Sequence, residues 1–179
     1  MKAQLMLHRF ALLLYVILLH ACNQEMNEDK KDDNTQQLFS LLNAKDIGID
    51  FVNSVKNQKN FNIFKYRNFY NGGGVALGDI NNDGLADVYI TGNMVANKLY
   101  LNKGNFQFED ISEKAGIEGN KPWSTGVVMV DINQDGLLDI YVSNAGNLEG
   151  NNHDNDLYIN NGDLTFTEKA ETYNLAKTG

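Results

Sequence analysis

Hydrophobic and polar residues alternate in short segments over most of this chain, and two of these segments are near copies of each other. The stretch 74–90 reads GVALGDINNDGLADVYI, and the stretch 126–142 reads GVVMVDINQDGLLDIYV. In each stretch two runs rich in β-branched residues flank a centre of Asp, Asn and Gly, which predicts two strands joined by a tight loop. No long stretch shows the 3.6-residue apolar spacing of an amphipathic helix. The pattern therefore predicts an all-β fold.

The similarity between the two stretches continues beyond the loop. Asp79 recurs as Asp131, 52 positions later, and the run Leu99–Asn102 recurs as Leu157–Asn160, 58 positions later. The second copy therefore contains six additional residues, which fall within 146–156. Repeats of this length that hold several short strands are typical of the blades of a β-propeller.

We expect the first repeat at 71–122 and the second repeat, with the start of a third, at 123–179. Two blades form an incomplete ring, because propellers need four or more blades and stacked repeats leave their outer faces bare. We therefore expect the chain to be part of a longer propeller. Before the repeats, two apolar and aromatic clusters at 47–52 and 61–66 predict short strands in an N-terminal segment, 38–70.

The start of the chain has the features of an export signal. A charged beginning precedes a short apolar run, Phe10–Leu19, which is too short to span a bilayer core that needs about 20 residues. Cys22 follows and is the sole cysteine, so no disulfide can form within the chain. The residues LHAC resemble the lipobox of bacterial lipoproteins, apart from His20, where a small or aliphatic residue is usual. The resemblance implies a signal peptide at 1–21 and a lipid on Cys22; the alternative is an ordinary signal peptide.

A polar segment, 22–37, separates this signal from the rest of the chain. It is rich in Asp, Glu, Lys and Asn and has almost nothing to bury, so we expect a disordered tether. Its acidic residues resemble the surface-export signals of bacterial lipoproteins, although an ordinary solvated linker explains them nearly as well. Together these features predict a lipid-anchored protein at the outer membrane or cell surface of a bacterium.

Each repeat contains a nine-residue acidic loop with the pattern Asp-x-Asn-x-Asp-Gly-Leu-x-Asp. Side-chain oxygens at positions 1, 3, 5 and 9 and the backbone carbonyl at position 7 can converge if the chain curls tightly, and Gly at position 6 permits the positive φ that this curl requires. Oxygen ligands in an irregular cage suit calcium better than magnesium, which demands an octahedron. Three carboxylates at short range also need a counter-charge. A polar hairpin turn is the simpler alternative, but it needs only two or three such residues.

The residues that follow each loop distinguish it from an EF-hand, because position 12 is apolar, Ile90 or Val142, and the flanks are strands. The repeats instead resemble the FG-GAP or VCBS repeats of integrin-type β-propellers. The stretch from Leu99 resembles the bacterial family that carries an ASPIC/UnbV domain, which is related to cartilage acidic protein. This resemblance implies that each loop joins two strands of a blade and binds calcium. The implied ligands are Asp79, Asn81, Asp83, Leu85 and Asp87 in the first repeat, and Asp131, Asn133, Asp135, Leu137 and Asp139 in the second.

Charge and histidine content argue against two other classes of function, nucleic-acid binding and histidine-based catalysis or zinc binding. The net charge of −8 disfavours nucleic-acid binding, because an acidic chain repels phosphates. Once the signal is removed, His153 is the only histidine, so neither a histidine-based triad nor a zinc site can be built. Trp123, at the start of the second repeat, is expected to pack in the core rather than to serve as a sugar platform.

These features predict a non-enzymatic, calcium-stabilised surface scaffold for binding or adhesion, with protein or glycan ligands. Two other functions stay open at this point. One is a calcium-dependent, lectin-like module that captures glycans on the inserted loop, which glycan-array binding would favour. The other is the non-catalytic part of a larger surface enzyme, which the gene sequence downstream of Gly179 would decide.

Overall fold

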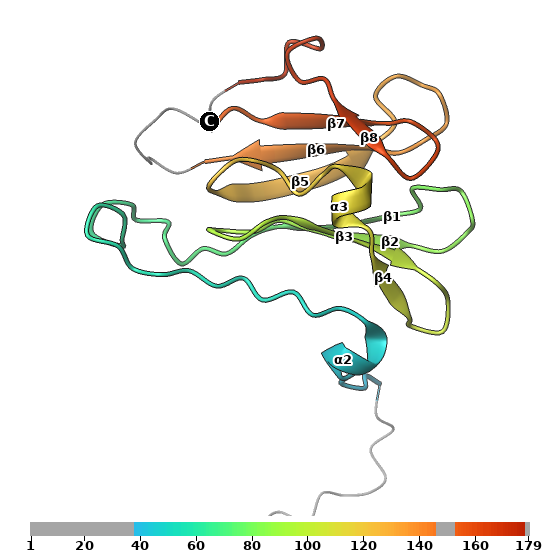
Figure 1. Cartoon of the computed structure of the whole chain (residues 1–179), viewed down its shortest axis with the longest axis horizontal. Helices are drawn as coiled ribbons and strands as arrows, with labels where there is room; N and C mark the ends of the chain where they lie inside the picture. Colours follow the sequence, from blue (N-terminus) through green and yellow to red (C-terminus); the bar gives the residue numbers. More distant parts are fainter. Residues whose placement is uncertain (1–37, 146–152, 178–179) are drawn as a thin grey trace, which may run out of the picture. The chain divides into compact units, whose positions relative to one another are not determined.

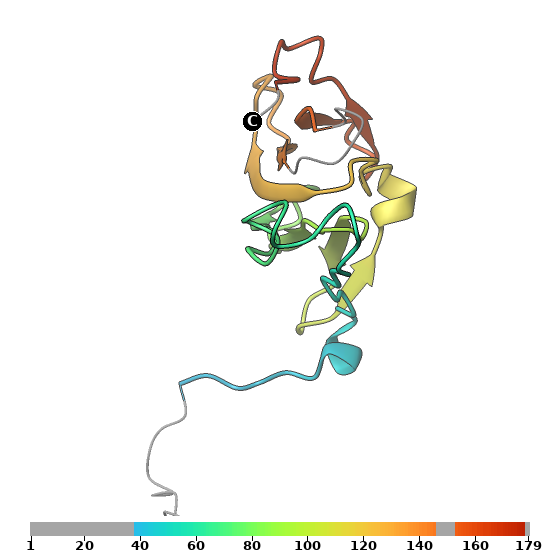
Figure 2. The same ribbon diagram turned by 90° about the vertical axis from the view of Figure 1, so that its left-hand side faces the viewer.

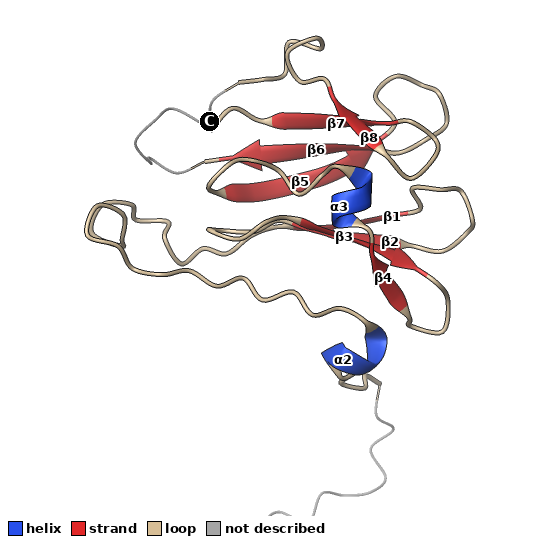
Figure 3. Cartoon of the chain, in the orientation of Figure 1, coloured by secondary structure: helices blue, strands red, loops and turns tan. Residues whose placement is uncertain are grey.

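The computed structural model describes residues 38–145 and 153–177. Within these ranges the chain forms two four-stranded antiparallel sheets, and in each sheet the strands follow one another in chain order (Figure 1; Figure 3). The first sheet contains β1 (Val75–Gly78), β2 (Asp87–Ile90), β3 (Lys98–Asn102) and β4 (Phe108–Asp110). The second contains β5 (Ser124–Val130), β6 (Asp139–Asn144), β7 (Asp156–Asn160) and β8 (Phe166–Glu168). The predicted all-β fold, two propeller-type blades that do not close a ring, is confirmed.

Each acidic loop connects the first two strands of its sheet. β1 pairs with β2 in a register that places Leu77 opposite Val88, and β5 pairs with β6 in the matching register, with Met129 opposite Ile140. β-Branched and aromatic residues fill these strands because they pack well on a pleated surface. The hairpin predicted around each loop is therefore confirmed.

A hydrophobic core lies between the two sheets. Seen from the side, the second sheet lies over the first (Figure 2). The connection between them contains a short helix, α3 (Ser112–Ala115). Burying each large apolar side chain contributes roughly 1.5–3 kcal/mol, so this shared core holds the two blades together. Its buried members are Ile80, Tyr89, Leu99, Leu101, Ile111, Ala115, Ile117, Ile140, Val142, Tyr158 and Phe166.

The described part of the N-terminal segment contains no strand, so the strands predicted at 47–52 and 61–66 are wrong. A helix of one turn, α2 (Ala44–Ile47), ends at Ile47, the first residue of the first region. The chain then has no regular secondary structure over 49–58. Its Asn53 instead exchanges two hydrogen bonds, of 2.8 and 2.9 Å, with Asn93, which follows β2.

The aromatic residues that suggested a strand at 61–66 form a second hydrophobic cluster. Phe61 and Tyr66 both contact Trp123, with ring centroids 5.1 and 5.5 Å away, and Phe69 completes the group. Edge-to-face contacts of this kind add about 0.5–1.5 kcal/mol per pair to the burial itself. The packing of Trp123 in the core is confirmed, and the apolar pattern of this segment reflects a cluster rather than a pleated sheet.

The predicted signal peptide at 1–21, the lipid site at Cys22 and the tether at 22–37 lie outside the described residues. The chain divides into two compact units, Met1–Ser40 and Leu41–Gly179, and both sheets belong to the second unit. Within 38–145 and 153–177, no helix has the length and apolar character needed to cross a membrane. The predicted domain boundaries stay predictions.

Candidate functional site

The first acidic loop is held in a tight curl by hydrogen bonds from its own backbone to its own side chains. Asp79, at position 1, accepts the N–H groups of Asp83 and Gly84, at 3.0 and 2.7 Å. Asp83 in turn accepts the N–H of Leu85 at 2.8 Å, and its other oxygen accepts the side-chain amide of Asn81 at 2.9 Å. Gly84 has φ +86°, the left-handed conformation predicted for position 6.

The second loop repeats this arrangement. Asp131 accepts the N–H groups of Asp135 and Gly136 at 3.1 and 2.9 Å, and Asp135 accepts the N–H of Leu137 and the side-chain amide of Asn133, both at 2.8 Å. Each distance agrees with its counterpart in the first loop to within 0.2 Å. The same nine-residue pattern therefore forms the same curl in both blades.

The carboxylates at position 9 differ from the others because they are fully buried. The two oxygens of Asp87 accept the N–H of Ile80 at 2.9 Å and that of Asn102 at 2.8 Å, which ties the start of the loop to β3. Asp139 makes the corresponding bonds in the second blade, to Ile132 at 3.0 Å and Asn160 at 2.8 Å. Sequence reasoning treated position 9 only as a ligand and missed this structural role.

The loop aspartates differ from some other charged side chains because they form no ion pair within the described residues. Burial raises the pKa of Asp87 above its ordinary value, and the neighbouring carboxylates of Asp83 and Asp79 raise it further. No ion pair in the described part of the chain involves a loop aspartate; the pairs are Lys98 with Asp110, Lys98 with Glu118 and Lys103 with Glu109. The three carboxylates of the first loop therefore lie near one another without a protein counter-charge.

The donor set is of the kind that a hard cation prefers, although the carboxylates point to backbone amides. Among the described residues, no three His, Cys, Asp or Glu side chains converge closely enough to form a complete metal site. Positions 1, 3 and 5 are brought together by shared hydrogen bonds, and position 9 joins them through the backbone of position 2. A carboxylate oxygen has two lone pairs, so one amide bond leaves a lone pair for a cation. The donor types at these positions, carboxylate, amide and backbone carbonyl oxygens, are those that calcium takes.

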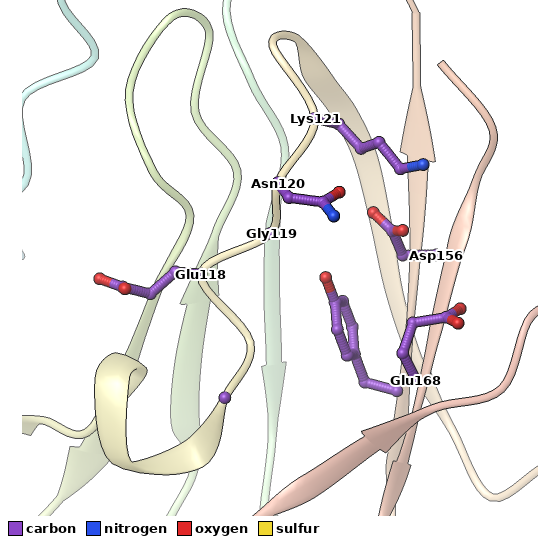
Figure 4. Close-up of a pocket in the computed structure, with 8 residues that line it drawn as sticks. Glu118, Gly119, Asn120, Lys121, Asp156 and Glu168 are labelled. Carbon is purple, nitrogen blue, oxygen red and sulfur yellow. The ribbon is translucent and has the colours of Figure 1, made fainter. Parts of the chain in front are cut away.

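A separate polar pocket of about 440 Å³ lies at the connection between the blades. It is lined by Gly116, Glu118, Gly119, Asn120, Lys121, Asp156, Tyr158 and Glu168. Figure 4 shows Asn120, Lys121, Asp156 and Glu168 around the hollow, with Glu118 turned away from them. Burial raises the pKa of Asp156 and of Tyr158. Sequence reasoning missed this pocket, because its walls come from the connection and from β7 and β8.

Comparison with known proteins adds to this geometry. Residues 79–142 match the family described as the FG-GAP-like repeat. The chain carries an FG-GAP-like repeat. The match begins at the first residue of the first loop and ends shortly after the second loop, so it includes both acidic loops. The two four-stranded antiparallel sheets are consistent with this match. The chain therefore contains a β-propeller-like repeat domain.

The chain is also similar to curated proteins named cartilage acidic protein 1. The protein from Xenopus tropicalis is 36% identical over 78 residues, which is 43% of this chain and 12% of that protein. The protein from Mus musculus is 33% identical over 73 residues, covering 41% of this chain and 11% of that protein. The protein from Homo sapiens is 33% identical over 76 residues, covering 42% and 12%. The aligned part of the chain thus spans about an eighth of the length of these relatives.

Proposed function

We propose that the FG-GAP-like repeats form a non-enzymatic, calcium-stabilised binding scaffold on a lipid-anchored bacterial surface protein. The observation that carries the proposal is the pair of matching acidic loops without a protein counter-charge. Bound calcium would supply that charge. The loop carboxylates hydrogen-bond to their own backbone, and none of them lines the polar pocket, which favours a structural role over a catalytic one.

Calcium titration of the purified full chain tests the metal. A ligand that binds only the folded state stabilises it by about 2.7 kcal/mol at a hundredfold excess over the dissociation constant. We expect two calcium ions per chain by calorimetry and a higher melting temperature in calcium than in chelator. An unchanged melting curve together with no bound calcium would contradict the proposal.

Single substitutions test the assignment of the ligands. Asp83→Ala and Asp135→Ala each remove position 5, and each should abolish one of the two sites. Gln134→Ala changes the neighbouring position 4, which supplies no ligand, and should leave two sites. Equal weakening by all three variants would mean that the ligand assignment is wrong.

One substitution tests the proposed lipid attachment at Cys22. Cys22→Ser should turn a chain that fractionates with membranes and incorporates a fatty-acid probe into one that does neither. If the wild-type chain takes up no label and fractionates as a soluble protein, an ordinary signal peptide replaces the lipoprotein signal.

The polar pocket favours a second candidate function, the capture of a sugar unit by a lectin-like site. Its walls combine the carboxylates of Asp156 and Glu168 with the ammonium of Lys121 and the amide of Asn120, groups that hydrogen-bond to hydroxyls. Asp156 is the last residue of the inserted segment 146–156, on which the alternative lectin-like function would capture glycans. A glycan array probed with the wild-type chain and with Lys121→Ala tests this function. Signals that Lys121→Ala leaves unchanged would exclude the pocket as the glycan site.

A further inference from the structure

The two acidic loops touch each other although they are 52 positions apart in sequence. Both project from the same end of the sheets (Figure 1). The side-chain amide of Asn82, at position 4 of the first loop, donates a hydrogen bond of 3.1 Å to the backbone carbonyl of Gly136, at position 6 of the second loop. Asn82 stands between two proposed ligand residues, and Gly136 directly follows another.

Asn160 and Gly78 provide two further contacts between the region of the first loop and the second blade. The side-chain amide of Asn160 is buried and donates to the carbonyl of Ile80 in the first loop at 2.8 Å and to that of Leu138 in the second at 3.2 Å. The backbone at Gly78 also approaches Leu138 closely, because a Cβ added there would lie 2.7 Å from its Cδ1. The first loop therefore contacts the second blade through Ile80 and Asn82, and the end of β1 contacts it through Gly78.

The equivalent positions of the second loop do not form the same bridge. Gln134 corresponds to Asn82, and it is exposed and has the same left-handed backbone, with φ 63° against 57°. Asn102 corresponds to Asn160, and its side-chain amide donates to Ala86 in its own loop. Of these two position-4 residues, only Asn82 makes an inter-loop contact of this kind among the described residues.

We propose that Asn82 couples the two loops, so that calcium in one loop raises the affinity of the other. This inference rests on the proposed calcium binding. Ligation at Asn81 and Asp83 fixes the residue between them, and the Asn82 side chain then holds the peptide of Gly136. The second loop is thereby ordered before its own ion arrives, and ordering one site in advance produces positive coupling. One neutral hydrogen bond corresponds to a coupling of about two- to tenfold in affinity.

Asn82→Gly removes the bridge without straining the chain, because glycine adopts φ 57° freely. Gln134→Gly is the matched control. Calcium isotherms of the full chain should show the second ion binding about two- to tenfold more tightly than either site binds in the single-site variants Asp83→Ala and Asp135→Ala. Asn82→Gly should abolish this difference, and Gln134→Gly should retain it.

Amide hydrogen exchange in chelator tests the bridge without any metal. Asn82→Gly should raise exchange across 131–138, whereas Gln134→Gly should leave exchange across 79–87 unchanged. Independent binding in the wild type, coupling that survives Asn82→Gly, or unchanged exchange across 131–138 would each overturn the inference. A chain that binds no calcium would instead refute the proposed function, and the exchange measurement would still decide whether Asn82 holds the second loop.

Discussion

Replacing Asp87 with alanine should destabilise the protein even when no calcium is present. The carboxylate accepts two backbone N–H groups, from Ile80 and Asn102, and is fully buried. Alanine can accept neither bond. The N–H of Ile80 is buried, and a buried N–H left unpaired costs about 1–3 kcal/mol; the half-buried N–H of Asn102 adds a smaller cost, so Asp87→Ala should lower the free energy of unfolding by at least about 1–3 kcal/mol. That loss is a large share of the roughly 5–15 kcal/mol that stabilises an ordinary domain.

Asp83→Ala is the control, because it removes a proposed ligand that lies on the surface. Asp83 accepts the N–H of Leu85 and the side chain of Asn81, and all three residues remain in reach of water. Water can replace the lost bonds, so the cost in chelator should stay below about 1 kcal/mol. In calcium, both variants should bind one ion fewer than the wild type.

Urea unfolding of the full chain, followed by the fluorescence of Trp123, measures these differences. Each variant is unfolded in chelator and in excess calcium. Asp87→Asn should fall between the wild type and Asp87→Ala, because it keeps one acceptor oxygen. If Asp87→Ala and Asp83→Ala cost the same in chelator, the carboxylate at position 9 acts only as a ligand and the structural role assigned to it is wrong.

Four further substitutions test the packing and the polar pocket. Trp123→Ala removes the centre of the aromatic cluster and should cost roughly 3–5 kcal/mol, measured by circular dichroism during urea unfolding. Asp156→Asn should match or exceed the wild type in stability at pH 7, because burial raises the pKa of this carboxyl above 3.8 and so disfavours its charged form in the folded state. This advantage should vanish as the pH falls towards 4. A stability difference that stays constant with pH would contradict burial as the cause. Gly74→Ala would place a Cβ 2.7 Å from the backbone oxygen of Thr125 and should lower the melting temperature, whereas at Gly126 a Cβ meets nothing closer than 3.8 Å, so Gly126→Ala should be mild.

The blades and the curl of each loop could be predicted because the same sequence pattern occurs in two copies. The pattern of nine residues contains its own acceptors and its own glycine, so the hydrogen bonds from Asp79 and Asp131 are local and follow from spacing. The segment before the repeats has no such second copy. Its apolar runs fit a strand and an aromatic cluster equally well, and only the position of Trp123 decides between them.

Contacts between distant parts of the chain could not be predicted for a different reason. The bond from Asn82 to Gly136 depends on how one blade is placed on the other, which no local pattern contains. The two bonds of Asp87 depend on the arrival of β3 beside the loop. The sequence pattern indicated Asp87 as a ligand and gave Asn82 no role. The structure adds a structural role for Asp87 and an inter-loop contact for Asn82.

The two loops share one sequence pattern but not one environment, and this difference follows from the order of the blades. Ile80, at position 2 of the first loop, is buried against the second blade and its carbonyl accepts the side chain of Asn160. Ile132, at the same position of the second loop, is only half-buried. The second blade therefore supports the first loop at Ile80, whereas the second loop depends more on hydrogen bonds within its own blade and on the bridge from Asn82. A counter-charge should consequently change the order of the second loop more than that of the first, even though the ligands in both loops are the same.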